Sequence, residues 1–105
     1  MALTRAFKET VKARATRDAK FRRALLTESI ECLLSGDLDT GKTMLRDYIN
    51  ATVGFETLAA TLDKSPKSVM RMFSEEGNPR ADNIFSIISM LGHREGVALE
   101  VRTTR

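Results

Sequence analysis

Cysteine, histidine, proline and tryptophan are nearly missing from this sequence: its 105 residues include one cysteine, one histidine, two prolines and no tryptophan. A single cysteine cannot close an internal disulfide, which favours a reducing compartment. No apolar run approaches the roughly 18 residues of a membrane span, and the basic start lacks the apolar core of a secretory signal. We therefore expect a cytoplasmic protein with no membrane segment.

Groups that perform catalysis or hold cofactors are also scarce. Cys32 and His93 are far apart, and no spacing of cysteine or histidine suits a metal. The tetrapeptide Thr-Gly-Lys-Thr at residues 40–43 is similar to part of a phosphate-binding loop, but the earlier glycine and the preceding strand of that motif are missing. We therefore interpret it as the start of a helix, and we expect no enzyme activity, no cofactor and no metal.

The length and the hydrophobic content, 42% of 105 residues, predict one domain with one core. Three helices are expected first, at about residues 5–15, 18–34 and 39–51. The first has Thr4 as its cap and only Phe7 and Val11 as an apolar stripe, so we expect it to lie loosely on the domain or to dock on a partner. Gly36 ends the second helix, in which Cys32 is typical of a small core residue. The inward residues of the third helix are Met44, Leu45, Tyr48 and Ile49.

Residues 53–91 show the pattern of a DNA-binding helix-turn-helix followed by one more helix. A helix over residues 55–62 places Leu58, Ala59 and Leu62 on one face, and the small Ala59 permits a steep crossing with the next helix. Asp63-Lys64 forms the turn between them. This spacing alone would suit any three-helix core, so the choice between the two interpretations depends on the capping residues.

The helix after the turn begins with a clear capping signal. Ser65 stands at the N-cap position and Pro66 at the first helical position, where its missing N–H costs nothing. The helix keeps an apolar side for packing and presents Lys67, Ser68 and Arg71 on its outer side, as donors for the major groove of DNA. The packing side consists of Val69, Met72 and Phe73. We therefore favour a DNA-recognition helix over a plain three-helix core.

These features resemble a known family, the lambda-repressor and Cro-like helix-turn-helix domains. The resemblance is carried by a Leu-Ala pair at residues 58–59, the Ser-Pro cap at residues 65–66 and the loop Gly77-Asn78-Pro79. A longer pattern is similar to one branch of that family, the HigA-like antidote proteins (antitoxins) of bacterial toxin–antitoxin modules. That pattern runs through residues 4–11, 51–55 and 71–79.

The chain departs from the family pattern at three positions. Phe55 stands where the family often has a Gln that reaches toward DNA, and Asp63 stands where the turn often has Gly. Lys64 replaces an apolar residue that usually packs inward. These departures concern the details of base recognition and not the fold.

The resemblance implies an all-α, lambda-repressor-like helix-turn-helix bundle, to which the residue patterns add two extra N-terminal helices and either a short C-terminal strand or a tail. We therefore divide a single domain into an N-terminal helical extension (1–36), a helix-turn-helix core (37–92) and a C-terminal tail or strand (93–105). The resemblance also implies a transcriptional regulator that binds double-stranded operator DNA as a homodimer, and an antitoxin that neutralises a small RNase toxin and represses its own operon. The alternative is a stand-alone repressor or protein-interaction module without a toxin partner. The expected DNA contacts are Ser65, Lys67, Ser68 and Arg71, with Thr57, Asn78 and Arg80 on phosphates.

The C-terminal part is expected to contain a last helix and a strand. The helix covers residues 81–91 and stops at Gly92, with His93 just beyond it as a cap or bystander. Residues 96–102 alternate apolar with small or charged side chains, which predicts a strand. This strand has no partner in the chain, so we expect it to pair with a second subunit or another protein, or otherwise to be a disordered tail.

Charge is distributed unevenly around the net value of +3. Residues 1–23 carry eight basic and two acidic side chains, residues 24–63 two basic and seven acidic, and residues 64–105 seven basic and five acidic. This alternation suggests two charged surfaces for two partners, although a solvated face explains a charge run equally well. Four acidic residues could cover the basic surface of an RNA-cleaving toxin: Glu28, Glu31, Asp37 and Asp39.

Overall fold

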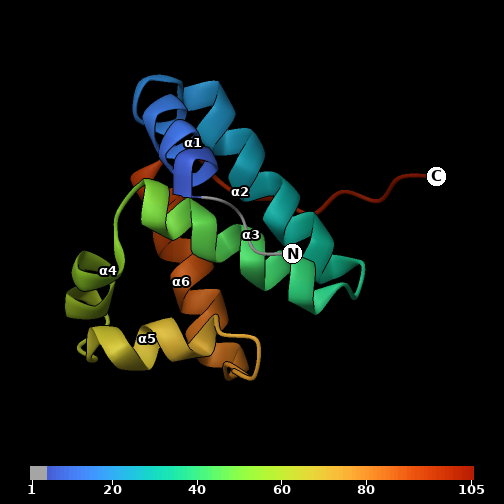
Figure 1. Ribbon diagram of the computed structural model, residues 1–105. Coiled ribbons are helices and arrows are strands. Elements are labelled where there is room, and N and C mark those ends of the chain that lie inside the picture. Colours follow the sequence, from blue (N-terminus) through green and yellow to red (C-terminus); the bar gives the residue numbers. More distant parts are fainter. Residues whose placement is uncertain (1–4) are drawn as a thin grey trace.

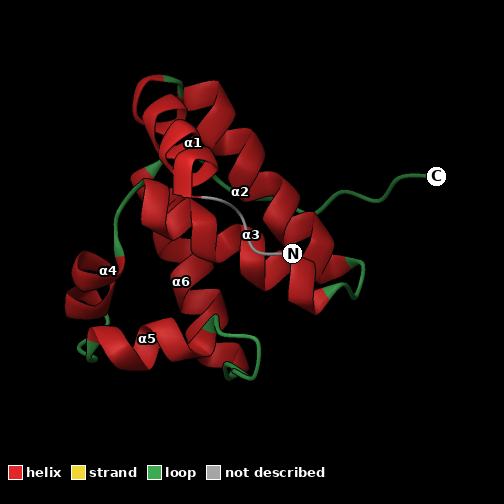
Figure 2. Cartoon of the chain, in the orientation of Figure 1, coloured by secondary structure: helices red, strands yellow, loops and turns green. Residues whose placement is uncertain are grey.

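Six α-helices follow one another in residues 5–105, the part of the chain described by the computed structural model (Figure 1). They are α1 (Arg5–Arg17), α2 (Ala19–Leu34), α3 (Leu38–Ala51), α4 (Phe55–Thr61), α5 (Pro66–Met72) and α6 (Ala81–Arg94). Figure 2 shows only helices and loops over these residues, which confirms the all-α prediction. None of the described helices has the length and apolar character needed to cross a bilayer. The expected cap Thr4 lies outside the described residues.

Three helices begin at side-chain caps, of which only Ser65 at α5 was predicted. The Asp18 carboxylate accepts a hydrogen bond from the Phe21 N–H at 3.1 Å, and the Ser65 hydroxyl accepts one from the Ser68 N–H at 3.1 Å. Asp37 does the same for α3. The N–H bond to Asp18 stabilises its charged form and lowers the pKa of that carboxyl below its ordinary value. Local side-chain chemistry therefore sets the helix starts.

The turn between α4 and α5 takes a left-handed backbone form that usually requires glycine. Asp63 has a φ of 55°, in the left-handed region. Its N–H bonds to the Ala60 carbonyl at 3.2 Å, and the Lys64 N–H bonds to the Ala59 carbonyl at 2.9 Å. This pair of bonds is the Schellman ending of a helix, and aspartate is one of the few residues that tolerate it. Asp63 therefore ends α4 in the way that glycine usually ends a helix.

The predicted end of α6 at Gly92 is wrong. Gly92 lies buried inside the helix, and the left-handed residue that ends it is Gly96, with a φ of 71°. The Val97 N–H bonds to the Gly92 carbonyl at 3.1 Å and completes the ending. His93 consequently lies in the last turn of α6 and not beyond it. Gly92 has a packing role instead, because the tail residue Leu99 lies against the space where a side chain would be.

The predicted C-terminal strand is also wrong for the described chain. Residues 97–105 form neither strand nor helix, and the C-terminus extends away from the helices in Figure 1. A strand needs a neighbouring strand for its backbone hydrogen bonds, and the described residues contain none. Of the apolar residues in this alternating pattern, Leu99 packs against α6, whereas Val101 is largely exposed.

The core forms where α2, α3 and the last three helices meet. Phe55 is buried against Phe73, with ring centroids 6.0 Å apart, so the Phe55 ring packs inward. Burying each such side chain stabilises the fold by about 1.5–3 kcal/mol. Leu45, Tyr48, Ile49, Leu58, Ala59, Val69 and Phe73 are buried as predicted, whereas Met44, Leu62 and Met72, also predicted to point inward, are only half-buried. The whole buried cluster consists of Leu26, Leu45, Tyr48, Ile49, Phe55, Leu58, Ala59, Val69, Phe73, Ile87 and Leu91.

α1 contacts the domain through little apolar surface, as its thin stripe predicted. Phe7 is exposed and Val11 half-buried, whereas Ala15 is completely buried. The Arg14 guanidinium lies 4.5 Å from the centre of the Phe21 ring, which joins α1 to α2 by a cation–π contact.

Candidate nucleic-acid interface

α5 presents two different sides. Val69 and the following Phe73 are buried in the core and fix the helix to the domain. Lys67, Ser68 and Arg71 are exposed, as predicted. In Figure 1, α5 lies at the opposite end of the molecule from α1. An anchored helix with free donors on its outer side is the form required for insertion into a major groove.

The hydroxyl groups of Ser65 and Ser68 form hydrogen bonds within the chain. Besides accepting the Ser68 N–H, the Ser65 hydroxyl donates to the Ser68 Oγ at 3.1 Å. Ser65 therefore serves first as the cap of α5. The Ser68 hydroxyl still has its own proton to donate, so it is the better base contact of the two.

An open groove of about 680 Å³ runs beside α5. Four of the predicted DNA-binding residues line it: Ser65, Ser68, Arg71 and Asn78. Its other lining residues are Lys64, Met72, Ser74, Glu76 and Gly77. Lys64 was predicted only as a departure from the family pattern, and its exposed side chain adds a positive charge to this groove.

The remaining predicted contacts lie outside the groove. Lys67 is exposed on α5, and Thr57 is exposed on α4, where its carbonyl accepts the Thr61 hydroxyl at 3.0 Å. Arg80 lies just before α6, with its Nε 3.4 Å from an Asp82 carboxylate oxygen. Both partners are highly exposed, so this ion pair contributes about 0–1 kcal/mol and leaves Arg80 able to exchange partners.

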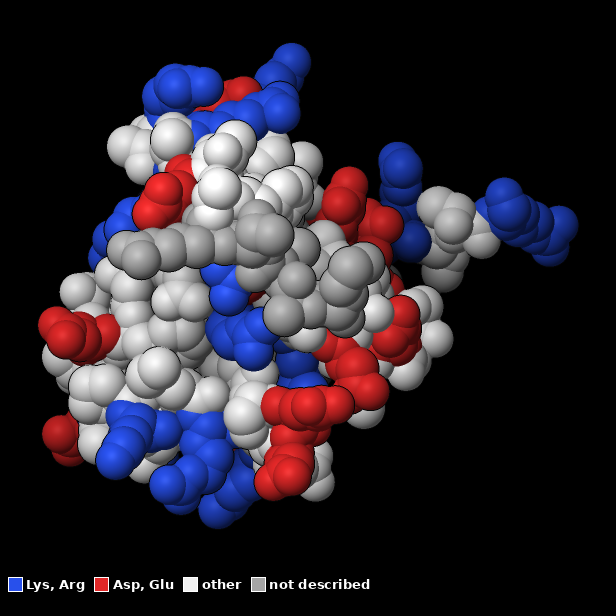
Figure 3. Space-filling view, in the orientation of Figure 1, with Lys and Arg blue, Asp and Glu red and all other residues white. Residues whose placement is uncertain are grey.

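Basic and acidic side chains gather in different places over this part of the surface. Figure 3 shows Lys and Arg side chains over α5, and Asp and Glu side chains over the turn between α2 and α3 and over the loop that follows α5. Glu75 and Glu76 of that loop are exposed, and Glu76 lines the groove. The basic group comprises Lys64, Lys67 and Arg71, all exposed. The exposed acidic group comprises Glu28, Glu31, Asp37 and Asp39, the four residues singled out in the sequence. The two groups could therefore attract partners of opposite charge.

Two residues that support the groove were not predicted. Lys42, on α3, is 9% exposed, and its Nζ donates to the carbonyl oxygens of Ser74 at 3.1 Å and Gly77 at 2.7 Å. Gly77 packs so closely on the end of α5 that a Cβ there would lie 2.0 Å from the Arg71 carbonyl oxygen. The sequence offered no signal for Lys42 beyond its inward position on a helix.

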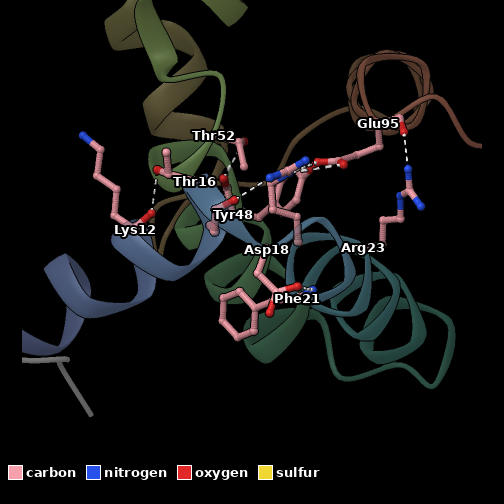
Figure 4. Close-up of polar contacts among 10 residues, drawn as sticks. Lys12, Thr16, Asp18, Phe21, Arg23, Tyr48, Thr52 and Glu95 are labelled. Carbon is pink, nitrogen blue, oxygen red and sulfur yellow. Dashed lines mark hydrogen bonds and ion pairs between the residues drawn. The ribbon is translucent and has the colours of Figure 1, made fainter.

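A buried polar cluster joins α2, α3 and the end of α6 at the other side of the domain (Figure 4). The Glu95 side chain, 6% exposed, accepts from Arg22 Nε at 3.1 and 3.3 Å and from the Tyr48 hydroxyl. Arg23 donates to the Glu95 carbonyl at 3.2 Å. Burial, followed by the hydrogen bond and charge of Glu95, raises the pKa of Tyr48 far above its ordinary value, so the hydroxyl remains a donor.

A second, more apolar hollow of about 560 Å³ lies between α1, α2 and α3. Phe21, Leu25 and Met44 contribute to it, and Asp47 lies among its lining residues. Burial raises the pKa of Asp47, although the nearby Arg46 opposes this shift. Among the described residues, no three His, Cys, Asp or Glu side chains are grouped as a metal site would require.

Comparisons with models of known protein families, with curated proteins and with solved structures each gave no match to this chain.

Proposed function

We propose that the chain is a transcriptional regulator of the lambda-repressor-like helix-turn-helix type, which binds double-stranded operator DNA through α5. The observation that carries this proposal is the outer side of α5, where Lys67, Ser68 and Arg71 are exposed beside a groove while Val69 anchors the helix. The major groove admits an α-helix, and arginine pairs with guanine through two hydrogen bonds. Arg71 is therefore the main candidate for base recognition.

The residues around α5 suit contacts to phosphates. Lys64 and Asn78 line the same groove as Arg71, and Arg80 and Thr57 are exposed on either side of it along the chain. Contacts of this kind fix the position of a protein on the duplex without recognising bases. They also release counterions, so the affinity should fall as the salt concentration rises.

The proposal includes a symmetric dimer, since one seven-residue helix reaches few base pairs and operators with two half-sites match a two-fold axis. The outer side of α6 is the surface best suited to a second copy. Phe85 is 67% exposed there, and Phe85, Ile88 and Leu99 are among the residues that line an open hollow of about 590 Å³. This assigns the contact to α6 in place of the strand pairing expected from the sequence.

Replacing Arg71 with alanine should weaken binding to the preferred duplex by about 1–3 kcal/mol, because one two-bond contact to a base is lost. The duplex is first selected by the wild-type protein from a random-sequence pool, and affinities are then measured at one salt concentration. Arg102→Ala, which removes the same charge from an exposed tail position, should bind as tightly as wild type. In a separate measurement, which tests the proposed dimer, sedimentation of the wild-type complex should give two chains per duplex. Equal affinities of Arg71→Ala and wild type would sink the assignment of α5.

A second function, neutralisation of a small RNase toxin, is favoured by the acidic group at the turn between α2 and α3. Glu28, Glu31, Asp37 and Asp39 are exposed, and none of them is ion-paired within the described part of the chain. The exposed Leu34 and Leu38 lie within the same turn region and could add apolar contact. A toxin that cleaves RNA needs a basic surface, which such a group would cover. Without a toxin partner, the chain would be a stand-alone repressor.

Reversing three of these charges should abolish binding to the product of the neighbouring reading frame and leave DNA binding intact. The variant is Glu28→Lys, Glu31→Lys and Asp39→Lys; Asp37 is kept because it caps α3. Pull-down at low and high salt measures the first effect, because attraction between exposed charges weakens with salt. Charge reversal is preferred to deletion of residues 1–36, because the deletion would also remove the buried residues Leu26 and Ser29 from the core. If wild type captures the product and the variant captures it equally well, the acidic group has no such role.

A further inference from the structure

We infer that Lys42 is a positioning residue of the DNA interface: it holds the loop of residues 74–78 against the end of α5, so that Asn78 and Arg71 share one groove. This inference rests on the proposed function and deepens it. Lys42 belongs to the Gly-Lys-Thr sequence that is similar to part of a phosphate-binding loop. It lies too deep in the domain to contact DNA itself, since it is 9% exposed.

The Lys42 ammonium is satisfied by backbone carbonyls alone. Its Nζ donates to Ser74 O at 3.1 Å and to Gly77 O at 2.7 Å, and no carboxylate forms an ion pair with it within the described chain. Removing a charge from water is costly unless hydrogen bonds replace the lost hydration. Release of the loop would leave this cation without its acceptors, so burial of Lys42 ties the loop to α3.

The two carbonyls belong to a chain of hydrogen bonds that leads to Arg71. The Gly77 N–H donates to Ser74 O at 3.0 Å, and the Ser74 N–H and hydroxyl donate to Arg71 O at 3.2 and 2.8 Å. Asn78 follows Gly77 directly and lines the groove with Arg71. Lys42 therefore fixes, through Ser74 and Gly77, the backbone on both sides of the groove.

The residue before Lys42 fixes the opposite side of α3. This residue, Gly41, packs against α2, where a Cβ would lie 2.6 Å from Leu33 Cδ2. The two residues together set α3 closely against α2 on one side and against the loop on the other.

Replacing Lys42 with methionine keeps the apolar stem and removes the donors. Affinity for the selected duplex should fall roughly tenfold, the effect of losing a charge-assisted hydrogen bond that orders the site. The slope of log affinity against log salt should not change, because no phosphate contact is lost. Lys64→Met, in contrast, removes a proposed phosphate contact and should reduce that slope by about one. Lys42→Arg, which retains donors, should recover most of the affinity.

Tyr48→Phe serves as the control for a merely structural effect, because it removes a buried hydrogen bond to Glu95 in a different part of the domain. Folded Tyr48→Phe should bind DNA like wild type. Amide hydrogen exchange at Gly77 should accelerate in Lys42→Met and not in Tyr48→Phe. Equal DNA affinity of Lys42→Met and wild type would overturn this inference alone. Failure of wild type to bind any duplex would overturn the proposed function and this inference with it.

Discussion

Replacing Glu95 with alanine should lower the free energy of unfolding by about 3–5 kcal/mol, because it removes one member of a buried ion pair. The Glu95 carboxylate accepts from Arg22 and from the Tyr48 hydroxyl, and its side chain is 6% exposed. Without it, the buried Tyr48 hydroxyl loses its acceptor, and the Arg22 guanidinium keeps only the Ala15 carbonyl. The effect exceeds that of a surface ion pair, because the Glu95 carboxylate is removed from solvent and Arg22 is only 26% exposed.

Urea denaturation followed by circular dichroism at neutral pH measures this change. Glu100→Ala provides the matched control, because Glu100 is exposed in the tail and should change the free energy of unfolding by less than about 0.5 kcal/mol. Glu95→Gln keeps an acceptor oxygen without the charge and should fall between the two. A loss below about 1 kcal/mol for Glu95→Ala would mean that Arg22 and Tyr48 find other acceptors, and that the cluster is not a main support of the fold.

The features that could be predicted from the sequence are those determined by residues close together in the chain. Ser65 and Pro66 marked the start of α5 because a cap and the first helical residue act within one turn. The inward positions of α4 and α5 followed from helical spacing, and Val69 and Leu58 are both completely buried. The same helical spacing placed Arg71 on the opposite, exposed side of α5.

The features that the sequence could not provide depend on contacts between distant residues. Glu95 meets Arg22, 73 positions away, and Lys42 meets the carbonyls of residues 32 and 35 positions further on. A charged side chain is ordinarily solvated, so neither position is marked as buried by its residue type. Gly92 was mistaken for the end of α6 because the sequence does not distinguish a glycine that permits close packing, such as Gly92, from one that ends a helix, such as Gly96.

Placing a side chain at Gly77 should be as damaging as removing one at Glu95. In Gly77→Ala, the new Cβ would lie 2.0 Å from Arg71 O and 2.9 Å from Met72 O, and both are backbone atoms at the end of α5. The loop can relieve this overlap only by moving away from the helix, which breaks the hydrogen bonds from Lys42. We expect a loss of about 3 kcal/mol in the free energy of unfolding, the upper range for overpacking.

Gly92→Ala is the matched control, because it adds the same methyl group at a glycine that is itself buried. Its Cβ would lie 3.1 Å from Leu99 Cδ1, the end of a side chain in the tail, which can move aside. Alanine within a helix gains about 0.5–1 kcal/mol over glycine, so this variant should equal or exceed wild type in stability. Urea denaturation compares the two variants, and DNA affinity measured on the fraction that stays folded should fall for Gly77→Ala only. Equal stability of both variants would show that the loop moves freely relative to α5, and that its position does not depend on the absence of a side chain at Gly77.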